Sequence, residues 1–108
     1  MVSKWEDFID NLRDEAGKLA KDELKDLVKT AKEDSEEFIR RQGEKLELYL
    51  NQLARGEITK EQFEGYILDI RDLSEMKVLE MSVEAKAKAQ RLAMGIVNLI
   101  LNGLISLL

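Results

Sequence analysis

The chain has 108 residues, with 17 basic and 22 acidic side chains and no histidine, cysteine or proline. This length allows one domain, and the lack of His and Cys excludes the usual zinc sites and nucleophile–base pairs. A net charge of −5 without a basic patch disfavours nucleic acid, because that binding depends on neutralising phosphates. We therefore expect a single non-enzymatic domain, residues 1–108, without a cofactor.

The first predicted element is an amphipathic helix over residues 4–54. Ser3 and Glu6 have the spacing of a capping box at its start. Gly17 lies inside this helix and weakens it without requiring a break. Asp34 and Glu37 also fit a capping box, so the helix could restart there. We favour one continuous helix, because the residues around Asp34 include no Gly or Pro, and keep a break near Asp34 as the alternative.

The clearest helix end in the sequence lies at Arg55–Thr59. Gly56 can take the left-handed conformation that ends a helix. Thr59 is a natural N-cap for a following helix, and Gln62 stands at the third helical position of a capping box. The pattern predicts a sharp reversal between two helices.

The predicted fold is all-α, a long antiparallel helical hairpin with arms at residues 4–54 and 60–108. Continuous arms of this length would each run roughly 75 Å at 1.5 Å per residue. Ser74 and Ser82 are candidate kinks in the second arm. Folding at the turn predicts contacts between residues near the two ends of the chain: Trp5, Phe8, Ile9 and Leu12 beside Ile100, Leu104, Ile105 and Leu108.

An apolar tail, residues 92–108, contains no charged side chain and is apolar around most of a helix. Its own chain, other copies or lipid must cover it, because burying each Leu or Ile contributes roughly 1.5–3 kcal/mol. A two-helix hairpin covers only one stripe, so we expect hairpins to associate into a four-helix or larger bundle. The expected interface, with another copy or with a membrane, is Leu92, Ile96, Val97, Leu99, Ile100, Leu101, Leu104, Ile105 and Leu108.

Asn98, Asn102 and Ser106 form a narrow polar stripe on the same helix, because they recur every four residues. If these side chains lie in the core of an assembly, a buried Asn would fix register and oligomer number. In that case Asn98→Leu should raise thermal stability and blur the oligomer number. The alternative, which has equal weight, places the stripe at the solvent edge of the tail.

The sequence favours a cytoplasmic, self-assembling helical interaction or structural protein, and leaves two alternatives. The tail could bind or enter a membrane, with Lys86, Lys88 and Arg91 at the lipid head groups, although its seventeen uncharged residues fall short of the usual span of about 20. Residues 1–84 carry a net charge of −8. This charge allows a basic protein partner, as for a small acidic inhibitor or an antitoxin-like regulator.

Overall fold

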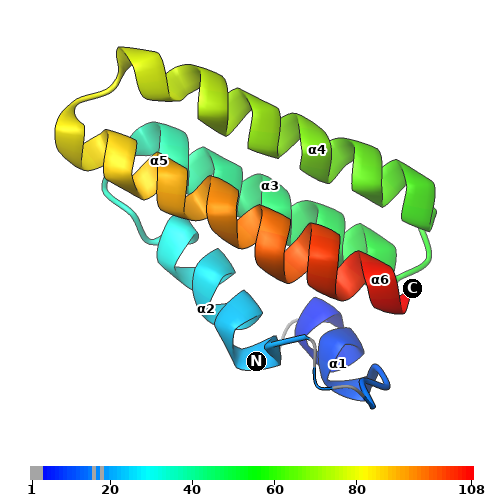
Figure 1. Cartoon of the computed structure of the whole chain (residues 1–108). Coiled ribbons are helices and arrows are strands. Elements are labelled where there is room, and N and C mark those ends of the chain that lie inside the picture. Colours follow the sequence, from blue (N-terminus) through cyan, green and yellow to red (C-terminus); the bar gives the residue numbers. More distant parts are fainter. Residues whose placement is uncertain (1–3, 16, 18) are drawn as a thin grey trace.

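The computed structural model describes residues 4–15, 17 and 19–108, and every regular element in this part of the chain is a helix. The fold is therefore all-α, as the sequence predicts. Figure 1 shows α3, α4 and the helix that begins with α5 running side by side, with α1 and α2 packed along one side of them. The elements in chain order are α1 (Lys4–Asn11), α2 (Lys21–Lys32), α3 (Glu37–Ala54), α4 (Lys60–Lys77), a 3-10 turn η1 (Val78–Glu80), α5 (Val83–Gly95), a π-helical segment η2 (Ile96–Leu104) and α6 (Ile105–Leu107).

The turn between α3 and α4 is confirmed in detail. α3 ends at Ala54, and Gly56 has a φ of +73°, the left-handed conformation that glycine adopts without strain. The Thr59 hydroxyl accepts a hydrogen bond from the Gln62 N–H at 3.1 Å, and the Thr59 N–H donates to Gln62 Oε1 at 2.9 Å. Both halves of the capping box are present, so local chemistry alone sets the start of α4.

The continuous first helix that we favoured is wrong, because three helices occupy residues 4–54. The first break follows Asn11, where Gly17 takes a φ of +65° and so turns the chain out of a helix. The Asp14 carboxylate accepts a hydrogen bond from the Leu19 N–H at 2.6 Å, which ties this loop together. The proposed cap at Ser3 lies outside the described residues, although α1 does begin at Lys4.

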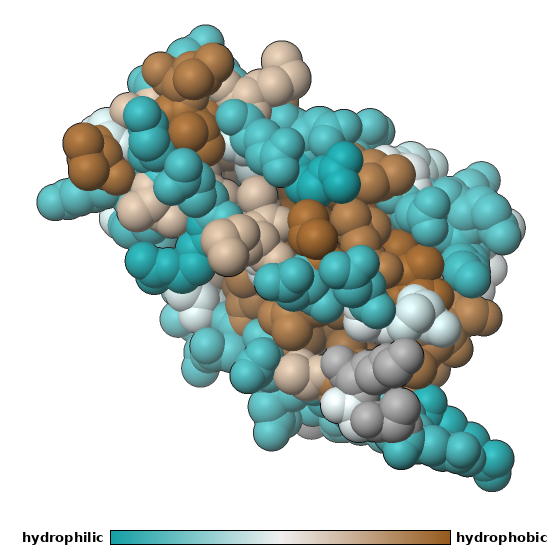
Figure 2. Space-filling model, in the orientation of Figure 1, coloured by the Kyte–Doolittle hydropathy of each residue, from teal (hydrophilic) through white to brown (hydrophobic). Residues whose placement is uncertain are grey.

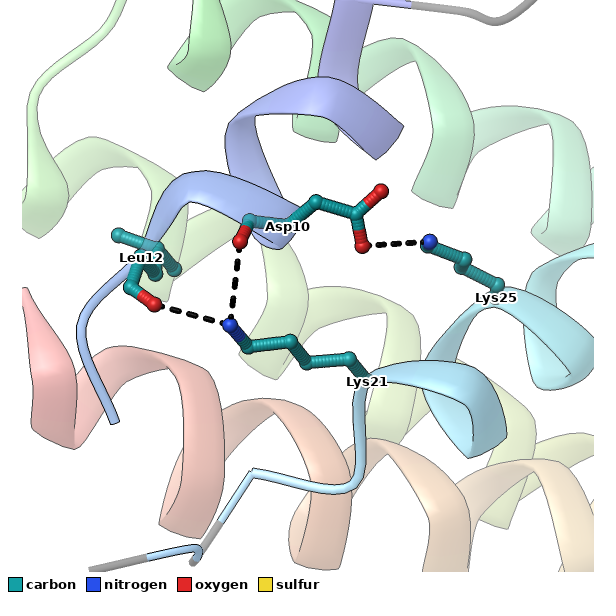
Figure 3. Close-up of polar contacts among 4 residues, drawn as sticks. All are labelled: Asp10, Leu12, Lys21 and Lys25. Atoms are coloured by element: carbon teal, nitrogen blue, oxygen red, sulfur yellow. Dashed lines mark hydrogen bonds and ion pairs between the residues drawn. The ribbon is translucent and has the colours of Figure 1, made fainter. Parts of the chain in front are cut away.

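Two lysines of α2 form hydrogen bonds and an ion pair with the C-terminal end of α1 across this loop (Figure 3). Lys21 Nζ donates to the backbone carbonyls of Asp10 and Leu12, at 3.3 and 2.8 Å, and so satisfies carbonyls that a helix end leaves without partners. Lys25 Nζ forms an ion pair with Asp10 Oδ1 at 2.6 Å. The hydrogen bond to Asp10 raises the pKa of Lys25 above its ordinary value of 10.5.

The second break lies at residues 33–36, so the alternative of a break near Asp34 is confirmed. Asp34 Oδ1 accepts a hydrogen bond from the Glu36 N–H at 2.8 Å, which favours a turn over a continuing helix. α2 can then fold back onto α3, where Gly43 leaves room for the backbone of Ala31. The expected second capping box does not form, because the N-cap of α3 is Glu36 and its side chain makes no capping bond.

The second arm is interrupted between α4 and α5. The Ser82 hydroxyl accepts a hydrogen bond from the Ala85 N–H and caps α5, so Ser82 does mark a break. Ser74 does not, because its hydroxyl donates to the Ile70 carbonyl at 2.8 Å and α4 continues past it. These breaks replace the roughly 75 Å hairpin expected at 1.5 Å per residue by a body of 39 × 28 × 25 Å.

The core is a single hydrophobic cluster to which all the long helices contribute. Trp5 and Ile9 of α1 belong to it together with Ile100 and Leu104 of the tail. α1 packs mainly on α3, so the end-to-end register expected for a hairpin stays a prediction beyond this shared cluster. On α3, Asn51 Oδ1 accepts a hydrogen bond from the backbone N–H of Trp5 at 3.3 Å. Breaking the first arm into three helices lets it cover the tail from more than one side.

Candidate interaction surface

The inner face of the apolar tail is buried within the single chain. Of the nine residues expected at an interface, five are buried, three are half-buried and Leu108 is 37% exposed. Helices α2 and α4 both contact η2 and supply this cover. An interface built from the whole set would require the bundle to open, and association of copies through these side chains stays a prediction. The buried five are Leu92, Ile96, Ile100, Leu104 and Ile105, and the half-buried three are Val97, Leu99 and Leu101.

The polar stripe faces solvent in the single chain. All three of its residues are exposed: Asn98, Asn102 and Ser106. Met94, four residues before Asn98, is 64% exposed, so every fourth residue from Met94 onward points outward. In an α-helix each step of four residues overshoots one turn by about 40°. The wider winding of π-helical η2 works against this drift and keeps the stripe on one side. The solvent-edge alternative therefore describes the single chain, and burial in an assembly stays a prediction.

Two glycines of the tail helix are contact points for the N-terminal part of the chain. A Cβ at Gly95 would lie 2.8 Å from Leu27 Cδ1, and one at Gly103 would lie 3.2 Å from Leu19 Cδ1. Both leucines therefore pack where the helix has no side chain. Neither glycine was assigned a packing role from the sequence. Glycines within an apolar helical stretch were the available signal, because they allow close packing.

The three basic residues expected at lipid head groups have different surroundings in the fold: Lys86, Lys88 and Arg91. Lys88 Nζ forms an ion pair at 3.2 Å with Asp34, whose side chain is only 11% exposed. Lys86 is half-buried and Arg91 is exposed. Lys88 therefore links α5 to the α2–α3 connection in the closed bundle, and it could meet a head group only by leaving Asp34.

The most exposed large apolar side chains lie on α4, on the α4–α5 connection and on α5, and we call this set the apolar corner: Met76, Leu79, Val83 and Met94. Leu79 and Val83 are 85% and 84% exposed. Figure 2 shows hydrophobic atoms at the upper left, the end at which Figure 1 places the α4–α5 connection. Met76, Leu79 and Val83 continue the helical spacing of the apolar side chains of α4. The helix does not continue with them, because the backbone of Met81 is extended and separates Leu79 from Val83.

A groove of about 420 Å³ lies beside Met94 of the apolar corner, between α4 and the tail helix. Val78, Ala93, Met94 and Val97 give it apolar walls, and Asn98 lies at its edge. The charged residues near the corner have both signs, and Lys77 forms an ion pair with Glu80 at 3.3 Å. An exposed apolar surface with a polar rim is typical of protein–protein contact sites.

No metal site is formed by the described residues, among which no group of three or more Asp or Glu side chains could hold an ion. Comparisons with protein-family models, with curated proteins and with solved structures find no match. The helical run Val83–Leu107, 25 residues long, is long and apolar enough to cross a membrane, and 39% of its most apolar stretch is buried within the chain. Length and composition of this kind are shared by core helices of soluble proteins.

Proposed function

We propose that the protein is a non-enzymatic helical interaction protein that self-associates through the apolar corner and the adjoining groove. The exposure of Leu79 and Val83, at 85% and 84%, is the observation that carries the proposal. Each such residue contributes roughly 1.5–3 kcal/mol when a partner covers it. Met94 and Val97 extend the same surface onto the C-terminal helix, so the outer face of that helix takes part in association while its inner face remains in the core.

The charges around the corner favour a second copy of this chain as the partner. A two-fold interface brings the same patch against itself, so a patch of one sign would repel its copy. Glu75, Lys77, Glu80 and Glu84 lie close to the corner in the sequence and carry a net charge of −2, from three acids and one base. Association would let Lys77 exchange its ion pair with Glu80 for one with a glutamate of the other copy. A surface with this acidic excess is less suited to an anionic membrane, which attracts basic segments.

The mass of the chain in detergent-free solution tests the proposal. Light scattering of the wild type should give a mass that rises above 12.4 kDa with concentration and reaches a discrete oligomer. Leu79→Lys should return the mass to that of one chain without lowering the thermal midpoint, because Leu79 is exposed.

Leu48→Lys is the matched control, since Leu48 is 50% exposed on α3 and lies away from the α4–α5 connection. It should leave the oligomer intact. A wild type that stays at 12.4 kDa at every concentration, or an equal response to both substitutions, would contradict the proposal.

Membrane association is the second candidate, and the length of the apolar run Val83–Leu107 favours it. Insertion would require the tail to leave α2 and α4, and would break the Lys88–Asp34 ion pair. Flotation with anionic vesicles separates the two candidates. The self-association proposal predicts that the protein stays at the bottom of the gradient, whereas co-flotation together with detergent-dependent solubility would favour the membrane. No contact among the described residues favours the inhibitor alternative.

A further inference from the structure

The described methionines all lie on α4, on α5 or on the connection between these helices. The sequence has four methionines and no cysteine, so thioethers are its only sulfur groups. Met76 is in α4, Met81 directly follows the 3-10 turn η1, and Met94 is in α5. Met1 lies outside the described residues. The sulfur chemistry of the described chain is thus confined to the elements that carry the apolar corner.

Two of these methionines are open to solvent in the single chain. Met76 and Met94 are 69% and 64% exposed, and both belong to the apolar corner. Met94 also lines the 420 Å³ groove, and Glu75, which precedes Met76, lines it from α4. Met81 differs, because it is half-buried and packs against the core. A small solute can therefore reach Met76 and Met94 without any opening of the fold.

We propose that Met76 and Met94 are oxidation sites, and that a hydroperoxide acting on them reverses the self-association proposed above, on which this inference rests. The thioether sulfur attacks the terminal oxygen of the hydroperoxide and the O–O bond breaks. The proton on that oxygen passes to the departing hydroxide or alkoxide. The sulfur loses two electrons and becomes a sulfoxide, while the hydroperoxide is reduced to water or an alcohol. A thiol-dependent sulfoxide reductase reverses the step, in which two thiols form a disulfide and the oxygen leaves as water.

A sulfoxide changes what this surface can pack against. The thioether of methionine is apolar and polarisable, and it packs well in irregular contacts. The sulfoxide oxygen is a hydrogen-bond acceptor, and burying it without a donor costs free energy. The groove beside Met94 is walled by Val78, Ala93 and Val97, whose side chains have no donor. A two-fold interface buries each oxidised residue twice, so association should weaken by at least about tenfold.

Limited oxidation with hydrogen peroxide tests the proposal, with mass spectrometry of peptides to place each added oxygen. Met76 and Met94 should be oxidised before the half-buried Met81. Light scattering should show an oligomer before treatment and single chains of 12.4 kDa after it. Methionine sulfoxide reductases with a dithiol should restore the oligomer. The thermal midpoint of the dilute chain should not change, because both oxidised side chains are exposed in the single chain.

Substitutions separate the two exposed sulfurs from the rest of the chain. Met76→Leu combined with Met94→Leu conserves apolar volume, so this double variant should associate like the wild type and keep its oligomer after the same treatment. Met81→Leu is the matched control and should stay as sensitive to peroxide as the wild type. Met94→Gln places a polar amide beside the groove and should weaken association by about tenfold without any peroxide.

The outcomes distinguish this proposal from self-association itself. A wild type that keeps its oligomer with Met76 and Met94 both oxidised would overturn the oxidation proposal alone. A double variant that still dissociates, or a Met81→Leu variant that becomes resistant, would do the same. A wild type that is a single chain before treatment would overturn both proposals.

Discussion

Gly43 of α3 and Ala31 of α2 lie backbone against backbone, and no side chain fits between them. A Cβ at position 43 would lie 2.6 Å from the Lys32 backbone nitrogen and 2.8 Å from the Ala31 carbonyl carbon. Backbone atoms cannot rotate away as the end of a side chain can. Gly43→Ala should therefore push α2 off α3 and lower the free energy of unfolding by about 1–3 kcal/mol, the usual cost of overpacking. Urea denaturation measures the change.

Gly65 in α4 is the matched control for this substitution. It is exposed, and nothing lies within 4 Å of a Cβ built there. Gly65→Ala should raise the free energy of unfolding by about 0.5–1 kcal/mol, because alanine loses less backbone entropy in a helix than glycine does. Stabilisation by both substitutions would show that α2 does not approach α3 as closely as described.

The capping box at Thr59 should contribute measurably to stability. Thr59→Ala removes the acceptor for the Gln62 N–H and should lower the free energy of unfolding by about 1 kcal/mol. Thr30→Ala, at an exposed position inside α2, should be neutral or slightly stabilising, because alanine has the higher helix propensity. Thermal unfolding followed by circular dichroism compares the two variants, and equal midpoints would contradict the capping role.

The Lys25–Asp10 ion pair should weaken at high pH. The hydrogen bond to Asp10 raises the pKa of Lys25 in the folded chain above the ordinary 10.5. The stability from this pair is therefore fully present below 10.5 and is lost as the pH rises through the raised folded value. The effect should be small, since exposed pairs contribute little.

Lys25→Met keeps the apolar stem and removes the charge. The difference in unfolding free energy between wild type and this variant should be larger at about pH 8 than at about pH 11.5. Denaturation of both proteins at each pH measures it. A difference that grows with pH would have the wrong sign for a lysine whose pKa is raised on folding.

Asn98→Leu should strengthen association without changing the stability of the single chain much. Asn98 is exposed at the edge of the 420 Å³ groove, so leucine would extend its apolar surface. The free energy of unfolding of the dilute chain should change by no more than about 0.5 kcal/mol. Asn102→Leu, one turn further and outside that groove, serves as the control. Sedimentation equilibrium should show tighter association for Asn98→Leu alone, and a large loss of stability would mean that Asn98 is not exposed.

The sequence predicted the elements that local chemistry determines. Gly56, Thr59 and Gln62 specify their turn within a few residues, and the structure reproduces both hydrogen bonds. The helical class was equally clear. The breaks after Asn11 and at residues 33–36 were harder, because Gly17 and Asp34 fit a helix as well as a turn, and the packing of α2 on α3 favours the turn. Gly43 has an ordinary helical conformation, and only the approach of Ala31 shows why a side chain is excluded there.

The candidate surfaces show the same distinction between features set by local sequence and features set by packing. The apolar tail and its polar stripe were visible as a pattern, but a pattern does not say which chain covers a buried face. The apolar corner could not be located from the sequence, because Leu79 and Val83 keep helical spacing although the helix is interrupted between them. The burial of Gln42, which is 2% exposed, could not be foreseen, since a glutamine in a charged helix is expected at the surface.

Amide hydrogen exchange of the dilute chain most directly tests the central claim, that the apolar tail is sheltered by its own chain. Ile100 and Leu104 are fully buried in one copy, so their amides should exchange only through global unfolding. Their protection should then be the same at concentrations above and below the onset of association, without detergent. Protection that disappears on dilution to the single chain would contradict the claim. It would show instead that the tail is buried at an interface between copies.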